Sequence, residues 1–158
     1  MSVKVGDTAP QFTLKNQDAE NVSLSDFQGK NIVVLFFPFA FSSVCSIEMK
    51  RMQQDMEKFT SLNAQILGIS VDSHYTLRAW KKDLQINFPL LSDFNKEVSR
   101  LYDSFYEIYA PGKYDYKGVS KRSAFVIDKK GKIIYKEICP NSGEQPDYDS
   151  IKKTLGNE

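Results

Sequence analysis

The stretch from Asn31 to Phe59 constrains the fold of this chain more than any other part of the sequence. It begins with a continuous apolar run, Ile32 to Phe37, made of β-branched and aromatic residues. Such a run is typical of a strand that is buried on both faces of a sheet. Pro38 ends the predicted strand, because proline has no N–H to donate to a neighbouring strand. We therefore expect the centre of a sheet here.

An amphipathic helix is predicted directly after this strand. Ser42 or Ser43 can cap it, and apolar residues then recur at helical spacing between charged ones: Cys45, Met49, Met52, Met56 and Phe59. Cys45 therefore falls in the first helical turn, where free backbone N–H groups and the helix dipole favour a thiolate near neutral pH. A buried, inert cysteine remains the alternative, because Cys45 belongs to the same apolar stripe as the methionines.

The rest of the chain predicts alternating strands and helices within one domain, residues 1–158. The expected strands are Gln11 to Leu14, Asn21 to Leu24, Ala64 to Val71, Pro89 to Leu91, Ser123 to Asp128 and Lys132 to Ile138. The expected helical segments are Ser25 to Lys30, Ser73 to Leu84, Asn95 to Leu101 and Asp147 to Leu155, and Phe105 to Gly118 is expected to be irregular. This order predicts an α/β protein whose central mixed sheet is flanked by helices, the thioredoxin-like arrangement.

Charge and composition exclude several functional classes. The chain has 21 Lys and Arg against 20 Asp and Glu, a net charge of +1, so we expect neither nucleic acid nor an anionic membrane as a partner. No stretch has the pattern of a signal peptide or the length of a membrane span, so a cytoplasmic location is expected. Two cysteines do not make a disulfide framework, and in a reducing compartment they are expected to be reactive or buried.

The residues before Cys45 favour the reactive interpretation. Ser42 precedes Cys45 by three positions and Pro38 precedes Ser42 by four, which gives the pattern P-x-x-x-S-x-x-C. Because a hydroxyl takes the place of the first thiol of a C-x-x-C motif, dithiol exchange is excluded. A hydroxyl beside a thiolate can instead bind an oxygen of a polar substrate, and Pro38 can shield the sulfur from water.

These residues carry a family resemblance. PFAFSSVCSIE resembles the peroxidatic-cysteine motif of the peroxiredoxins, the alkyl hydroperoxide reductase/thiol-specific antioxidant family. ISVDSHYTLRAW, FPLLSDF and RSAFVID follow in the order and at the spacings of that family, and VGDTAPQF extends the resemblance almost to the start of the chain. The motif P-x-A-F-S/T and the short C-terminal segment are most similar to those of the one-cysteine alkyl hydroperoxide reductase E group. Ser42 is a mild departure, since most relatives have Thr there.

The resemblance implies an enzyme that reduces hydrogen peroxide, alkyl hydroperoxides and peroxynitrite without a cofactor or metal. It makes Cys45 the peroxidatic thiolate, Ser42 the hydroxyl that holds the peroxide and Pro38 a shield. It makes Arg122 the cation that stabilises the thiolate and the leaving oxygen. A guanidinium suits this role because it stays charged and presents several N–H donors in a fixed geometry. Glu48 is expected to orient Arg122. A surface ion pair for Arg122 and an ordinary first-turn carboxylate for Glu48 remain the alternatives.

The role of Cys139 stays open. A sulfenic acid on Cys45 must be reduced by a second thiol, but Cys139 does not match the usual resolving positions of the family. The predicted sheet places it at the same edge as Cys45 with one strand between them, ~10 Å apart. This exceeds the Cα–Cα limit of about 7 Å for a disulfide. We therefore expect an external reductant, such as thioredoxin, a glutaredoxin-like protein or a low-molecular-weight thiol. Cys139 could form the disulfide only if the turn at Cys45 unwound or a partner subunit contributed the thiol.

Two other functions were weighed against the peroxidase. A non-catalytic thioredoxin-fold binding protein or chaperone would not need Ser42, Pro38 and Arg122, all of which are present. Copper delivery would need a site of paired cysteines with histidine, and the chain has a single histidine, His74, which is expected to be structural. Family members commonly dimerise through loops near the active site, so a homodimer or higher oligomer is expected. Its candidate contacts are aromatic: Phe39, Phe41, Tyr75 and Trp80.

Overall fold

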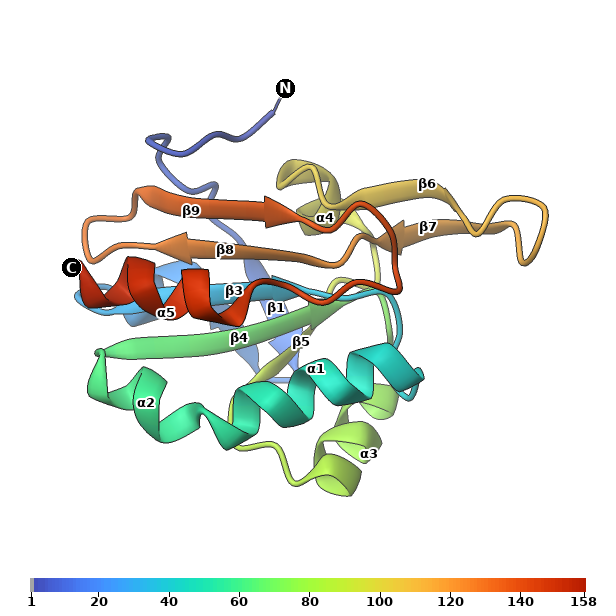
Figure 1. Ribbon diagram of the computed structural model, residues 1–158. Coiled ribbons are helices and arrows are strands. Elements are labelled where there is room, and N and C mark those ends of the chain that lie inside the picture. Colours follow the sequence, from blue (N-terminus) through green and yellow to red (C-terminus); the bar gives the residue numbers. More distant parts are fainter. Residues whose placement is uncertain (1) are drawn as a thin grey trace.

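A seven-stranded mixed sheet forms the centre of the computed structural model, which describes residues 2–158 (Figure 1). Its strands are β1 (Thr13–Asn16), β2 (Asn21–Ser23), β3 (Asn31–Phe36), β4 (Ala64–Ser70), β5 (Leu90–Ser92), β8 (Ser123–Ile127) and β9 (Ile133–Ile138). The helices are the 3-10 turn η1 (Leu24–Phe27), α1 (Ser43–Gln54), α2 (Met56–Ser61), α3 (His74–Leu84), α4 (Glu97–Leu101) and α5 (Tyr148–Gly156). The predicted α/β arrangement is confirmed.

The strand order is β2-β1-β5-β4-β3-β8-β9, with β3 between a parallel and an antiparallel neighbour. β4 runs parallel to β3, and β8 runs antiparallel to it, pairing Phe36 with Ser123. Because β9 is antiparallel to β8, it runs parallel to β3, as the sequence predicts. The carboxyl ends of β3, β4 and β9 therefore lie at one edge of the sheet, and the segments that follow them build the site.

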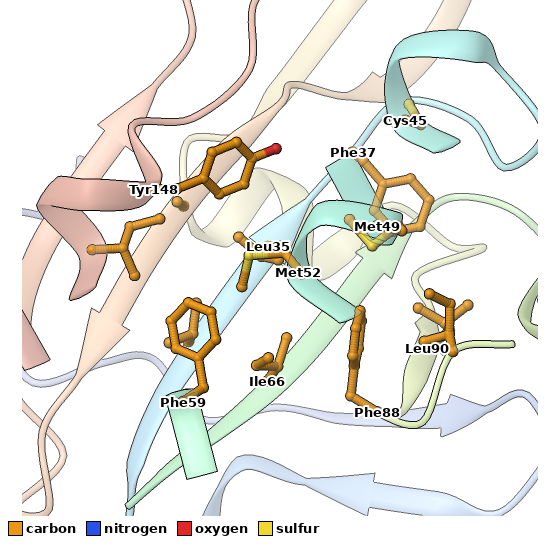
Figure 2. Packing of buried hydrophobic residues seen from close by; sticks show 14 of the residues in the cluster. Leu35, Phe37, Cys45, Met49, Met52, Phe59, Ile66, Phe88, Leu90 and Tyr148 are labelled. Carbon is orange, nitrogen blue, oxygen red and sulfur yellow. The ribbon is translucent and has the colours of Figure 1, made fainter. Parts of the chain in front are cut away.

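Two hydrophobic cores cover the two faces of this sheet. Side chains alternate along β3, so Val33 and Leu35 join one core while Val34 and Phe36 join the other. The first core is completed by α1, α2, α3 and α5, and Figure 2 shows its sulfur and aromatic side chains packed along α1. The second is completed by the N-terminal segment, η1 and α4. All of β3 is buried, as its continuous apolar run predicts.

The helix that begins after Ser42 is shorter than predicted. It is interrupted at Asp55, whose φ of −92° and ψ of 7° separate α1 from α2. Asp is a weak helix former, and here its carboxylate accepts hydrogen bonds from Arg51 at 3.0 Å and from Lys152 of α5 at 2.7 Å. The bend still leaves Phe59 fully buried in the first core.

The prediction that Phe105 to Gly118 is irregular is wrong. The segment contains β6 (Phe105–Tyr109) and most of β7 (Tyr116–Ser120), which form a separate antiparallel hairpin that projects beyond the main sheet (Figure 1). Pro111 and Gly112 lie in the turn instead of interrupting a strand. Aromatic residues favour strands, and Tyr109 pairs directly with Tyr116 across the hairpin.

The two longer predicted helices after the Cys45 region begin within one residue of their predicted starts, as α3 and α5. Ser73 Oγ accepts a hydrogen bond from the Thr76 N–H at the start of α3, and Asp147 caps α5 by accepting from the Ser150 N–H. Within residues 2–158, no helix combines the length and apolar character needed to cross a membrane.

Candidate active site

Cys45 lies in the first turn of α1, just beyond the carboxyl end of β3. Its side chain is fully buried and sits at one end of the first core, with Met49 and Met52 following along the helix (Figure 2). Ser42 occupies the N-cap position, where its carbonyl accepts from the Ser46 N–H at 2.9 Å. The Ser42 hydroxyl does not cap the helix but donates to the Phe39 carbonyl at 3.0 Å. The Ser42 hydroxyl is therefore bound to the backbone of the turn between β3 and α1.

Arg122 reaches Cys45 from the start of β8. The pairing of Phe36 with Ser123 brings Arg122 beside the end of β3. Its Nη1 and Nη2 atoms each donate to the Cys45 sulfur at 3.4 Å. Nη2 also donates to the Ser142 carbonyl at 2.8 Å, which fixes the plane of the guanidinium. Because only 1% of Arg122 is exposed, the alternative of a surface ion pair is wrong.

Glu48 lies one turn after Cys45 and is fully buried. Its Oε1 accepts from Arg122 Nη1 at 2.6 Å, so the same nitrogen contacts both the carboxylate and the sulfur. Burial raises the pKa of Glu48 from 4.5 to about 7, although Arg122 lowers it. Glu48 Oε2 and Arg122 Nε have no hydrogen-bond partner among residues 2–158. Glu48 is thus not an ordinary exposed carboxylate of a first helical turn.

The position of Cys45 in the helix does not by itself produce a thiolate. Burial raises the pKa of the Cys45 thiol; the Arg122 guanidinium, the Ser42 hydroxyl and the Phe39 backbone lower it, and Glu48 raises it further. The net direction is upward, so placement in the first helical turn does not by itself offset the burial of the sulfur. Burial outweighs the stabilisation, of which Arg122 supplies the largest part.

Aromatic side chains surround the segment between β3 and α1. Pro38 is buried just after the end of β3. The Phe39 ring packs edge-on against two tyrosine rings, with ring centroids 5.3 Å apart for Tyr109 and 5.8 Å apart for Tyr116. Trp80 is fully buried and donates from its indole nitrogen to Ser46 Oγ at 3.3 Å. Trp80, for which the sequence allows a core position or a subunit contact, therefore belongs to the core.

Asp72, which was not predicted as part of the site, follows the carboxyl end of β4. Its Oδ2 accepts from the Ala40 N–H at 2.8 Å and from Ser70 Oγ at 2.7 Å. A carboxylate directly after a parallel strand could have been noticed, because ligands and catalytic groups gather at that edge of an open α/β sheet.

Cys139 follows β9 on the far side of Arg122. Its N–H donates to the Arg122 carbonyl at 2.9 Å, and β8 separates its strand from β3, as predicted. Its side chain is buried, and both cysteines are free thiols. Burial raises the pKa of the Cys139 thiol to about 12, with Glu137 and Glu48 adding to the rise. Cys139 is thus close to the site, and its burial disfavours the thiolate form.

The chemistry that this arrangement supports is nucleophilic attack by sulfur. A buried thiol lies against a fixed cation and beside a hydroxyl, and both groups can stabilise charge that develops during the attack. Among residues 2–158, no group of three or more His, Cys, Asp or Glu side chains is arranged to hold a metal ion.

Comparisons with known proteins agree with this site and fold. The model of the AhpC/TSA family matches residues 5–136. Alkyl hydroperoxide reductase E from Mycobacterium tuberculosis is 34% identical over 139 residues, covering 86% of each chain. Peroxiredoxin Bcp from Escherichia coli is 36% identical over 131 residues, covering 83% of each. The crystal structure of peroxidoxin BcpB from Mycobacterium tuberculosis superposes with a TM-score of 0.84 at 25% identity, covering 98% of this chain and 97% of that one.

A nucleophilic cysteine with a fixed cation on a thioredoxin-like sheet defines a thiol-dependent oxidoreductase. The chain belongs to the AhpC/TSA family and is a peroxiredoxin, a thiol peroxidase.

Proposed function

We propose that Cys45 is the peroxidatic residue and that the protein reduces hydrogen peroxide, alkyl hydroperoxides and peroxynitrite. The contact of both terminal nitrogens of Arg122 with the Cys45 sulfur, at 3.4 Å, carries this proposal. The thiolate attacks one peroxide oxygen, an S–O bond forms, and the O–O bond breaks. Cys45 becomes a sulfenic acid, and the other oxygen leaves as an anion that takes up a proton. The enzyme is expected to stabilise the transition state, in which this charge develops, more strongly than the bound reactants.

The surrounding residues have separate roles in this proposal. Arg122 stabilises the thiolate and the leaving oxygen, and Ser42 donates its hydroxyl proton to a peroxide oxygen. Pro38, buried at the end of β3, keeps water from the sulfur. Glu48 holds Arg122 in place through the 2.6 Å ion pair. A charged partner in a fixed position orients the guanidinium before substrate binds, and such preorganisation lowers the barrier.

We infer a one-cysteine cycle with an external thiol reductant. Attack of Cys139 on the sulfenic acid would need its thiolate, and the high pKa of this buried thiol disfavours that form. Within the family, such a cycle is most consistent with the group of alkyl hydroperoxide reductase E. The reductant is then thioredoxin, a glutaredoxin-like protein or a low-molecular-weight thiol, all of which the cytoplasm supplies.

We also propose that residues 1–158 act as one domain and that two copies associate near the site. A single sheet, which includes both the N-terminal hairpin and β9, supports the first part. For the second, Phe41 is 55% exposed and Tyr75 is 72% exposed, and both aromatic side chains come from segments at the edge that contains Cys45. A Phe41→Glu variant should sediment as a smaller species than the wild-type protein. Equal sedimentation of the two proteins would count against this contact.

Intact mass after one equivalent of hydrogen peroxide, without added reductant, tests the proposed cycle. The wild-type protein and Cys139→Ser should each gain one oxygen, and Cys45→Ser should gain none. A wild-type mass lower by two hydrogens, or a disulfide dimer that Cys139→Ser does not form, would instead identify Cys139 as the resolving residue. Oxidation that persists in Cys45→Ser would show that another residue is the peroxidatic one.

A further inference from the structure

We propose that Asp72 is a positioning residue for peroxide reduction, holding the segment from Pro38 to Ser42 in the conformation that presents the Ser42 hydroxyl to substrate. Asp72 does not touch the sulfur, and it acts through the backbone of that segment. The inference rests on the roles proposed above for Cys45 and Ser42.

The first observation is how firmly Asp72 is held. Its Oδ2 accepts from Ser70 Oγ at 2.7 Å, and the Asp72 N–H donates back to Ser70 Oγ at 3.2 Å. The Asp72 carbonyl accepts from Ser92 Oγ at 2.6 Å, which joins it to the end of β5. The carboxylate is therefore fixed by the carboxyl ends of two parallel strands, and it offers a rigid acceptor to the neighbouring segment after β3.

The second observation is that one peptide unit connects Asp72 to Ser42. The N–H of the unit between Phe39 and Ala40 donates to Asp72 Oδ2 at 2.8 Å. The carbonyl of the same unit accepts from the Ser42 hydroxyl at 3.0 Å and from the Ser42 N–H at 3.4 Å. Because the peptide unit is planar, fixing its N–H also fixes the direction of its carbonyl. The position of the Ser42 oxygen therefore depends on the Asp72 carboxylate, and in this proposal the hydroxyl proton turns from the Phe39 carbonyl to the peroxide when substrate binds.

The third observation is that the segment is strained where it turns. Phe41 has a φ of +70°, in the left-handed region that aromatic residues rarely adopt. Such a conformation persists only where surrounding contacts impose it. The contact from Ala40 to Asp72 lies immediately before Phe41, and the Ser42 contacts with Phe39 lie immediately after it. Loss of the Asp72 contact removes the restraint on one side and lets the segment relax.

Two rates measured on the same protein follow the position of this segment, and rescue by a conservative variant separates this role from a general loss of structure. Peroxide reduction needs the positioned hydroxyl, whereas alkylation by iodoacetamide needs only an accessible thiolate. In Asp72→Ala the second-order rate constant with hydrogen peroxide should fall by about tenfold or more, the scale of one lost hydrogen bond to a charged group. Alkylation of the buried Cys45 should become several-fold faster. Opposite changes support the proposal, and unchanged rates or two changes of the same sign overturn it.

Further variants make the comparison independent of folding. Asp72→Asn keeps an oxygen that can accept from the Ala40 N–H and should recover most of the peroxide rate. Ser70→Ala keeps Asp72 but removes the hydroxyl that orients it, so it should change both rates in the same directions by a smaller factor. Asp103→Asn is the matched control, because Asp103 Oδ2 also accepts a long-range backbone hydrogen bond, from the Val3 N–H at 2.9 Å, outside this segment. Both of its rates should equal those of the wild type.

The failure of this inference is distinguishable from failure of the proposed function. If the wild-type protein consumes peroxide in a Cys45-dependent way and Asp72→Ala keeps the wild-type rates, only the role of Asp72 is wrong. If Cys45→Ser consumes peroxide as fast as the wild type, the proposed function itself is wrong, whatever the Asp72 variants do.

Discussion

Arg122 and Glu48 form an ion pair in which both side chains are buried, with 2.6 Å between Nη1 and Oε1 and side-chain exposures of 2% and 0%. The same Nη1 donates to the Cys45 sulfur at 3.4 Å. A negative charge on Glu48 and one on Cys45 therefore compete for one cation. Removing one member of a buried pair generally costs about 3–5 kcal/mol of stability, because the other charge is left without a partner. A change to either Arg122 or Glu48 should therefore alter both the stability of the fold and the reactivity of Cys45.

Glu48 should make the free energy of unfolding depend on pH. Burial raises its pKa from 4.5 to about 7, so between these values the folded protein holds a proton that the unfolded chain has released. The contribution of Glu48 is therefore fully present below about pH 4.5 and is lost as pH rises through 7. Relative to Glu48→Gln, the wild type should lose about 3 kcal/mol across this window.

Urea unfolding of the two proteins from pH 4.5 to 8 measures this difference. Glu48→Gln is a suitable reference because it keeps the size of the side chain and removes its titration. A difference between the two proteins that stays constant over the whole range would mean that Glu48 is ionised throughout, and that the pair with Arg122 outweighs burial.

Replacement of Arg122 by Lys should slow peroxide reduction by about 10²–10³-fold. An ammonium group is a single point of charge and cannot reproduce the two donors that contact the sulfur. Arg122 lowers the pKa of Cys45 mainly through its charge, which lysine keeps, so Arg122→Gln is the variant that should shift the rise of rate with pH to higher pH. The second-order rate constant with hydrogen peroxide, measured from pH 5 to 10 for both variants, reports the two effects. An Arg122→Gln profile whose midpoint coincides with that of the wild type would contradict the assignment of Arg122.

Much of the fold could be predicted from the sequence, because local pattern and burial agree in most elements. The apolar run before Pro38 specifies β3, and the sequence patterns of residues 73–84 and 147–155 specify α3 and α5. The errors occur where tertiary contacts decide. Asp55 ends α1 because charged partners on α1 and α5 hold its carboxylate, and nothing in the helical spacing of the sequence reveals a partner on a distant helix.

The site was predictable to a different degree. The spacing of Ser42 and Cys45 and the motif around Arg122 identify the residues, and the structure brings them within contact of one another. The balance of charges could not be predicted, because it depends on how completely Cys45 and Glu48 are buried, and burial is a property of the whole fold. The position of Asp72 after a strand could be seen in the sequence, but its contact with Ala40 could not, because it joins residues that are far apart in the chain.

The junction between α1 and α2 should be stabilised by Asp55. Its Oδ2 accepts from both Lys152 and Arg51, and all three side chains are at least partly shielded from water. Asp55→Asn removes the charge with little change of shape, so the free energy of unfolding should fall by about 1–2 kcal/mol. Asp18→Asn is the control, since its contact with Arg78 is 3.5 Å long and exposed. It should cost less than about 0.5 kcal/mol in urea unfolding, and equal losses in the two variants would refute the role of the junction.

The Ser42 hydroxyl, and not the size of its side chain, should set the reactivity of Cys45. The hydroxyl lies within hydrogen-bond distance of the Phe39 carbonyl and beside the Cys45 thiol, whose pKa it lowers when its single proton turns from the carbonyl to the sulfur. Ser42→Thr keeps the hydroxyl on the same carbon atom, so its rate with hydrogen peroxide should stay within about threefold of the wild type. Ser42→Ala should be about 10- to 100-fold slower, the scale of one lost hydrogen bond to a charged group. Its thiolate absorbance at 240 nm should also appear at higher pH. If the Ala and Thr variants lose rate equally, packing in the turn, and not the hydroxyl, controls the reaction.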